Sequence, residues 1–132
     1  MTKSFFKTVL RDTLNSIEKT LGVKAMEYVR NDNAMHNFDV GARITGQTRE
    51  KVLHGFALKH HVSIHDMRND IEAGKLPSKE IVDEKVGDAI NYLILEKASI
   101  LDKIEQNKSC KYVKKEGESC SLNNSCKYPN CD

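Results

Sequence analysis

The sequence predicts an all-α protein, a helical bundle of four to five helices followed by an irregular cysteine-containing tail. Apolar residues recur at helical spacing along most of the chain, strand-like alternation is absent through residue 106, and only two prolines occur in 132 residues. Hydrophobic residues make up 39% and charged residues 30% of the chain, as in ordinary globular domains. The length suffices for one modest domain with its own core.

The first half of the chain contains two predicted helices. Apolar residues from Phe5 onward share one helical face, and Gly22 is the predicted stop of that helix. A second apolar patch spans 23–29, and a short helix through Phe38 then ends at Gly46.

A longer helix is expected to begin after Thr48, a good N-cap, and to close at Gly74. Ser63 offers an alternative start, because residues 63–66 have the form of a capping box, so a break is expected near residues 61–64. Its apolar stripe comprises Leu53, Phe56, Ala57, His60, Ile64, Met67 and Ile71.

The last main helix is predicted over roughly residues 79–106, opened by Pro77 and Ser78. Its central apolar stripe, which we expect to face the core, comprises Val82, Val86, Ala89, Leu93, Ile100 and Ile104. The predicted organisation is therefore an all-α domain over residues 1–106 and a polar tail over residues 107–132.

The tail carries every cysteine of the chain. Spacers of nine, five and four residues separate the thiols, and large aliphatic residues are scarce around them. Four thiolates could hold a structural Zn²⁺ tetrahedrally, although no C-x-x-C pair is present. A thiol-bearing tail without metal is the alternative, and disulfides are not favoured in a reducing compartment. The four residues are Cys110, Cys120, Cys126 and Cys131.

Charge and hydropathy limit the expected partners. A formal net charge of +2 does not indicate nucleic-acid binding. No apolar run approaches the length of a membrane span, and charges interrupt the first 22 residues where a secretory signal would be apolar. We therefore expect a cytoplasmic protein with no membrane partner.

A polar ladder interrupts the last main helix. Within "EKVGDAINYLIL", residues 84–95, the side chains of Glu84, Asp88 and Asn91 are spaced by four and three residues along one edge. Apolar neighbours flank Asp88, so we expect its carboxylate to be partly buried and to have a cation or donors. A divalent cation between Glu84 and Asp88 would satisfy both, and oxygen ligands suit Mg²⁺ or Mn²⁺. Asn91 would hydrogen-bond a carboxylate or the ligand. The alternative is an exposed edge, or a core aspartate that caps a neighbouring helix.

Four further residues are candidates for ligand contact. His60 lies within an apolar stripe, as a core histidine would, or it binds metal or phosphate with the help of Lys59. Lys24 lies one turn before Glu27 and is either half of a surface ion pair or a phosphate-binding cation. Tyr92, on the last main helix, is the remaining candidate.

These segments resemble a known enzyme family. "EKVGDAINYLIL" resembles the second metal-binding helix of MazG-like all-α nucleotide pyrophosphohydrolases. "VKAMEYVRNDNAMHNF" and "LKHHVSIHDM" resemble segments of a related phage and bacterial family, the nucleotide-modification-associated domain. The resemblance covers about residues 5 to 105. It implies facing helices that hold Mg²⁺ against a nucleoside triphosphate, and attack of water on the α–β phosphate link to give a monophosphate and pyrophosphate.

Carried over by this resemblance, Glu84 and Asp88 match the second acidic motif, and Glu27 matches one acid of the first. All three are therefore candidate metal ligands and catalytic residues. The E-E-x-x-E pattern usual in the first motif is missing, so His60, Asp66 or substrate phosphates would have to complete the metal site.

Three functional hypotheses result. The first is a metal-dependent enzyme of phage nucleotide metabolism that hydrolyses a nucleoside triphosphate. The second is a module that binds or sequesters a nucleotide without turnover. The third is a helical interaction module whose edges form a homo-oligomer, which we also expect under the first two. Binding of Mg²⁺ by the acidic residues separates the first two from the third, and pyrophosphate release separates the first from the second.

Overall fold

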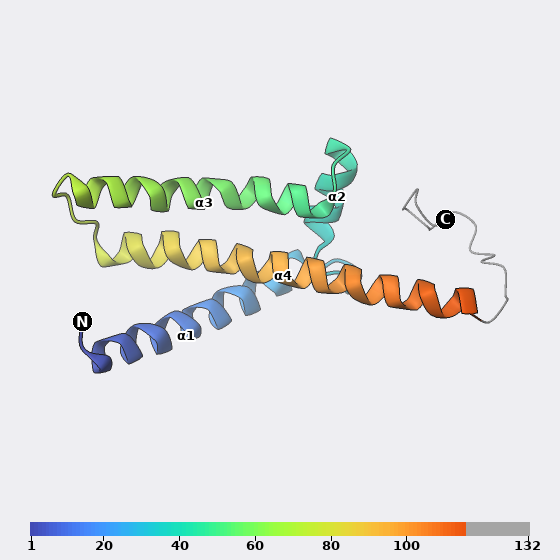
Figure 1. Ribbon diagram of the computed structural model, residues 1–132, viewed down its shortest axis with the longest axis horizontal. Helices are drawn as coiled ribbons and strands as arrows, with labels where there is room; N and C mark the ends of the chain where they lie inside the picture. The colour runs from blue at the N-terminus through green and yellow to red at the C-terminus, as the bar shows by residue number, and fades with distance from the viewer. Residues whose placement is uncertain (116–132) are drawn as a thin grey trace. The chain divides into compact units, whose positions relative to one another are not determined.

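The computed structural model describes the backbone of residues 1–115 and the side chains of residues 1–23 and 29–108. Within this part of the chain it contains four α-helices and one isolated β-bridge, between Arg30 and Asn33 (Figure 1). The predicted all-α fold is therefore confirmed, with four helices. These are α1 (Lys3–Tyr28), α2 (His36–Thr45), α3 (Arg49–Glu72) and α4 (Lys79–Lys115).

The chain separates by its internal contacts into two compact units, Met1–Ser99 and Ile100–Asp132. Helix α4 continues to Lys115, past residue 106 where its end was predicted. That prediction was wrong because residues 107–115 contain neither Gly nor Pro, so no residue in this stretch breaks the helix.

The predicted end of α1 at Gly22 was also wrong, since the helix runs on to Tyr28. A glycine inside a helix costs only about 1 kcal/mol relative to alanine, which is too little to stop a helix that good helix formers continue. The chain turns instead at Asn31 and Asp32. Their φ values of 53° and 61° lie in the left-handed region, which Asn and Asp tolerate better than most residues.

The predicted end of α2 and start of α3 are both confirmed. Gly46 follows α2 with a φ of 65°, and its N–H donates to the carbonyl oxygen of Ala42. Thr48 is the N-cap of α3, because its hydroxyl oxygen accepts a hydrogen bond from the Lys51 amide at 3.3 Å. The Gly46 backbone and the Thr48 hydroxyl thus determine where α2 ends and where α3 begins.

Helix α2 packs against the first turns of α3. The rings of Phe38 and Phe56 meet edge to face, with centroids 6.0 Å apart and planes at 78°. A Cβ built on Gly41 would lie 3.1 Å from a methyl of Val52, so α2 approaches α3 closely at this glycine.

Helix α3 is continuous across residues 61–64, where a break was predicted. The Ser63 hydroxyl donates to the Lys59 carbonyl oxygen at 3.0 Å within the helix and therefore does not cap a new one. The predicted closure is confirmed at Gly74, whose φ is 80°. Ser78 then caps α4 by accepting a hydrogen bond from the Ile81 amide at 3.3 Å.

Helices α3 and α4 lie side by side and run antiparallel (Figure 1). Two contacts fix their register. The Arg49 Nε donates to the Ser99 hydroxyl at 2.7 Å, and the His60 Nδ1 lies 3.5 Å from the Asp88 Oδ2. Eleven residues separate Arg49 from His60, and eleven separate Asp88 from Ser99, which is three turns on each helix.

The predicted core face of α4 was only partly right. Ala89 is buried, but Leu93 is 52% exposed, and Ile100 and Ile104 are also about half exposed. Helix α4 instead buries Asn91 and Ser99 and partly buries Asp88, because α3 presents charged and polar side chains to Asp88 and Ser99. The buried residues of the described part are Ile17, Val52, Leu53, Ala57, His60, Ala89, Asn91 and Ser99.

Candidate functional site

The candidate site lies between the middle of α3 and the first half of α4. His60 is only 7% exposed, and its Nδ1 approaches Asp88 Oδ2 at 3.5 Å. The His60 ring also stacks on Tyr92, with centroids 5.2 Å apart and planes at 27°. The expected partial burial of Asp88 is confirmed, since its side chain is 29% exposed. His60 therefore combines core packing with a contact that orients a carboxylate.

Glu84 lies one turn before Asp88 and is more exposed. The Lys85 ammonium lies 2.7 Å from Glu84 Oε1. This hydrogen bond, followed by the charge of Lys85 and the weaker influence of His60, lowers the pKa of Glu84 below its ordinary 4.5. The same pairing raises the pKa of Lys85 above 10.5. Glu84 is therefore an anion at neutral pH and is already paired with one cation.

Asn91 completes the polar edge of α4 and is 8% exposed. Its amide oxygen is buried and has no hydrogen-bond partner among the described residues. The register of α3 and α4 explains this, because Asn91 lies three residues beyond Asp88 and therefore opposite Ala57, which carries no polar group. A buried carbonyl oxygen without a donor costs roughly 1–3 kcal/mol, so this one is suited to a cation or donor that the described residues do not supply.

The structure brings together only some of the predicted site residues. His60, Glu84, Asp88, Asn91 and Tyr92 lie on adjoining turns of α3 and α4. Lys59 and Asp66 lie at exposed positions of α3, outside this group. The side chains of Lys24 and Glu27 lie outside the described residues, as do those of Cys110, Cys120, Cys126 and Cys131.

A metal centre made of three acidic, histidine or cysteine side chains is absent from the described residues. The candidate metal ligands on α4 are of a different kind. They consist of two carboxylates and one amide oxygen at successive turns, which suits a hard cation that keeps several waters. The His60 contact would act behind this set by holding the orientation of Asp88.

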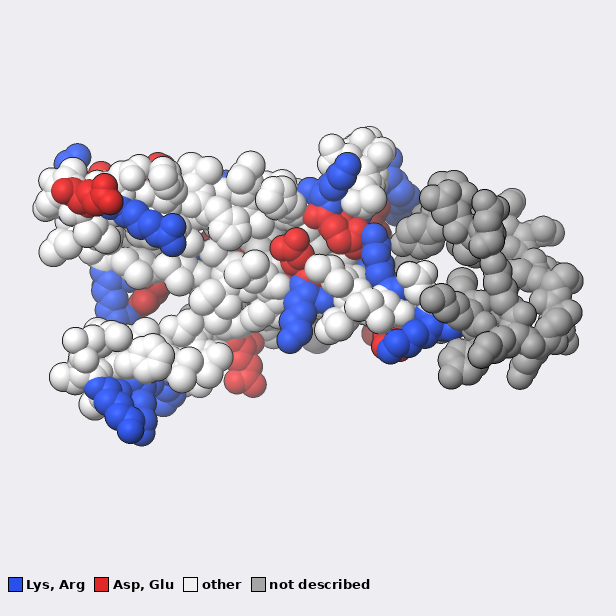
Figure 2. Space-filling model, in the orientation of Figure 1, with Lys and Arg blue, Asp and Glu red and all other residues white. Residues whose placement is uncertain are grey.

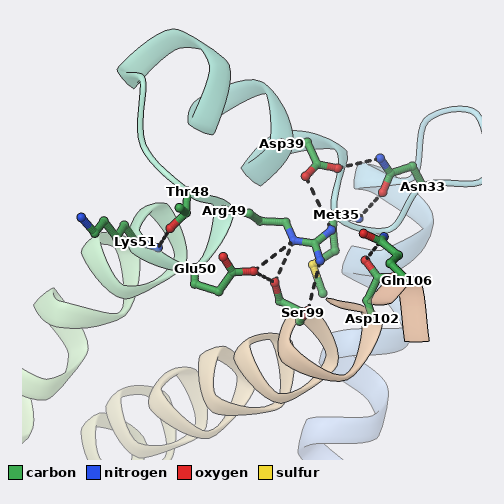
Figure 3. A network of polar contacts seen from close by, with 10 residues as sticks. All are labelled: Asn33, Met35, Asp39, Thr48, Arg49, Glu50, Lys51, Ser99, Asp102 and Gln106. Carbon is green, nitrogen blue, oxygen red and sulfur yellow. Dashed lines mark hydrogen bonds and ion pairs between the residues drawn. The ribbon is translucent and has the colours of Figure 1, made fainter. Parts of the chain in front are cut away.

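A second polar cluster joins α2, α3 and α4 and was not predicted (Figure 3). Ser99 is fully buried, and its hydroxyl accepts from Arg49 Nε and donates to Glu50 Oε1, both at 2.7 Å. The Arg49 Nη2 reaches the Ser99 carbonyl oxygen at 3.2 Å, and Nη1 lies 3.6 Å from Asp39. Asn33 donates to the other Asp39 oxygen at 2.9 Å. Because Arg49 is the first residue of α3, this cluster ties the α2–α3 corner to α4.

Sequence reasoning missed this cluster because it joins residues 50 positions apart. A usable signal was present on α4, where Asp88, Tyr92, Leu95 and Ser99 follow one another at spacings of four, three and four. That edge, rather than the more apolar stripe, is the one that faces α3.

Comparisons of the chain with protein-family models, with curated proteins and with solved structures gave no match. The resemblance to MazG-like enzymes therefore stays a prediction. Among the described residues, no helix is both long enough and apolar enough to cross a membrane.

Proposed function

We propose that the chain is a metal-dependent nucleotide-binding protein whose site is the polar edge of α4. Glu84, Asp88 and Asn91 would hold Mg²⁺ or Mn²⁺ through oxygen atoms at successive turns. The observation that carries the proposal is the buried amide oxygen of Asn91, which has no hydrogen-bond partner among the described residues. A cation there would compensate its desolvation and would also reverse the repulsion between the two carboxylates.

The neighbouring residues have distinct roles in this proposal. His60 orients Asp88 from α3, and Tyr92 supports the imidazole ring by stacking on it. Lys85 is within reach of Glu84, so it can turn from that carboxylate to a phosphate oxygen when the metal binds. Exposure of Glu84 leaves an open side for a triphosphate to approach.

The proposed function extends to hydrolysis of the bound nucleotide. A Mg²⁺ held by Glu84, Asp88 and Asn91 would offset the negative charge that grows on the leaving pyrophosphate. Water would attack the α-phosphorus, the bond to the bridging oxygen of the β-phosphate would break, and a carboxylate would accept the proton of the water. Glu27 is the further acid that the resemblance assigns to the site.

Binding without turnover is the second candidate function. Two features of the described residues favour it. They contain no cluster of three acidic, histidine or cysteine side chains, and Glu84 is already neutralised by Lys85. A site with two carboxylates fixes the orientation of a metal–nucleotide complex less firmly than a site with four carboxylates does.

Calorimetric titration with a panel of nucleoside triphosphates, with and without Mg²⁺, tests binding, and pyrophosphate release tests turnover. Asp88→Asn should weaken Mg²⁺-dependent binding at least tenfold, about 1.4 kcal/mol. The matched control is Asp83→Asn, since Asp83 lies on α4 but is exposed and pairs with Lys79.

The outcomes of this experiment differ for each hypothesis. Binding with pyrophosphate release supports the enzyme, and binding alone supports the second candidate. Absence of Mg²⁺-dependent binding to any nucleotide, or equal losses in both variants, would refute the proposed site.

A further inference from the structure

The N-terminal half of α1 exposes a continuous apolar face. Five large side chains, between 44% and 59% exposed, lie within about 180° of one another around the helix axis. Ile17, on the same stripe, is buried at 8% exposure, so the fold covers this stripe only toward the C-terminal half of α1. The α1 apolar face consists of Phe5, Phe6, Val9, Leu10 and Leu14.

The exposed area of this face is that of an interaction site. An aromatic side chain can bury about 150–250 Å², so two half-exposed phenylalanines and three somewhat smaller aliphatic residues leave roughly 400 Å² uncovered. Two such faces account for about 800 Å², so an interface of roughly 1,200 Å² would also include the polar side chains that flank them. The α1 apolar face would then form the centre of a pairing with a second copy.

The charges beside the α1 apolar face favour one arrangement of two copies. Lys3, Lys7, Arg11 and Glu18 fall within about 80° of one another on one flank of the helix. Figure 2 shows Lys and Arg side chains gathered on one side of this end of α1, with uncharged side chains beside them. Among the described residues, no ion pair engages Lys3, Lys7 or Glu18.

In an antiparallel pairing whose two α1 helices cross near Leu10, opposite charges on the two flanks come together. This pairing brings Phe6 of one copy to Leu14 of the other and the basic end of one flank alongside Glu18 of the partner. A parallel two-fold pairing would instead place this flank on opposite sides of the two helices, so that Lys3 and Glu18 could not meet.

We propose that the α1 apolar face docks a second copy of this chain, with the two α1 helices antiparallel. The resulting interface is isologous, so the same patch serves both copies. It lies on α1, away from the α4 polar edge, and it does not depend on the proposed nucleotide function. Asp88→Asn should accordingly remain a dimer.

Sedimentation velocity of the full chain over a concentration series tests the proposal. The wild type should be a dimer, and Leu10→Glu and Leu14→Glu should each raise the dimer dissociation constant at least tenfold. Both positions are about half exposed, so the helical content seen by circular dichroism should not change. Leu58→Glu on α3 is the control, because Leu58 is equally exposed but lies outside the face.

Charge reversal tests the orientation independently. Glu18→Lys should weaken the dimer, and the double variant Lys3→Glu with Glu18→Lys should restore it, as only an antiparallel pairing allows. A wild type that is monomeric at every concentration overturns the proposal, as does a dimer that tolerates both leucine variants. Failure of the double variant to restore the dimer overturns the antiparallel arrangement.

Discussion

Replacement of Ser99 by alanine isolates one hydroxyl group at the centre of the α2–α3–α4 cluster. The hydroxyl is fully buried and makes two hydrogen bonds of 2.7 Å, one from Arg49 and one to Glu50. Both partners are charged, and the side chain of Arg49 is only 12% exposed. The Ser99→Ala variant therefore removes an acceptor from one ion and a donor from the other where water has little access.

The size of the effect follows from these contacts. A hydrogen bond to a charged group contributes about 1.5–3 kcal/mol. Two such bonds would give about 3–6 kcal/mol, but Arg49 Nε and Glu50 Oε1 already lie 3.8 Å apart and can close on each other when the hydroxyl is gone. We expect a net loss of about 2–3 kcal/mol in the free energy of unfolding, or about 7–11 °C in melting temperature for a chain of this size.

Urea unfolding followed by far-ultraviolet circular dichroism measures this loss. The control is Ser63→Ala on α3, where the hydroxyl donates only to the Lys59 carbonyl oxygen of its own helix. That variant should be neutral or slightly stabilising, because such back-bonding does not join elements. If Ser99→Ala loses less than about 0.5 kcal/mol, the size of an ordinary surface substitution, the cluster does not hold the helices together.

Gly41→Ala should destabilise the fold by about 1–2 kcal/mol in urea unfolding, since its Cβ would lie 3.1 Å from a Val52 methyl, whereas Gly55→Ala, with open space around its Cβ, should stabilise it by up to about 1 kcal/mol. Equal effects would show that α2 does not approach α3 so closely. In metal-free buffer, melting curves of wild type and Glu84→Gln should differ by a constant amount above pH 4.5 and converge as the pH falls through the lowered pKa of Glu84. A gap that persists in strong acid would show that the Lys85 pairing is not its source.

Much of the fold could be predicted because its corners depend on single residues. Gly46, Thr48, Gly74 and Ser78 act through their own backbone or hydroxyl groups, so the sequence alone indicates them. The ends of α1 and α4 could not be predicted in the same way. A glycine such as Gly22 weakens a helix by about 1 kcal/mol but does not end it unless the following residues favour another conformation.

The packing face of α4 was harder to predict because it depends on α3. Counting apolar residues favours the stripe of Leu93, yet α3 presents Arg49 and His60 and thereby selects the edge of α4 that can hydrogen-bond to them. The sequence indicated the shared edge of Asp88 and Asn91, because both lie on one helix, and it named His60 as a candidate from its place in an apolar stripe. The contact of His60 with Asp88 joins two helices and could not be predicted from spacing along one of them.

The polar contacts between α3 and α4 fix the register of the two helices. Among the described residues, the amide oxygen of Asn91 takes no part in these contacts. Arg49 with Ser99 and His60 with Asp88 repeat after eleven residues on both helices, so a slip of one turn would separate both pairs at once. An apolar seam would tolerate such a slip, whereas paired polar groups oppose it even when they add little net stability. Register thus accounts for these four residues without any ligand. It does not account for Asn91, whose buried oxygen lacks a partner in the described structure and lies next to two carboxylates on the same edge. Among the described residues the Asn91 amide oxygen adds no hydrogen bond across the helix pair, and for this reason the proposed metal–nucleotide site rests on Asn91 more than on the charged residues around it.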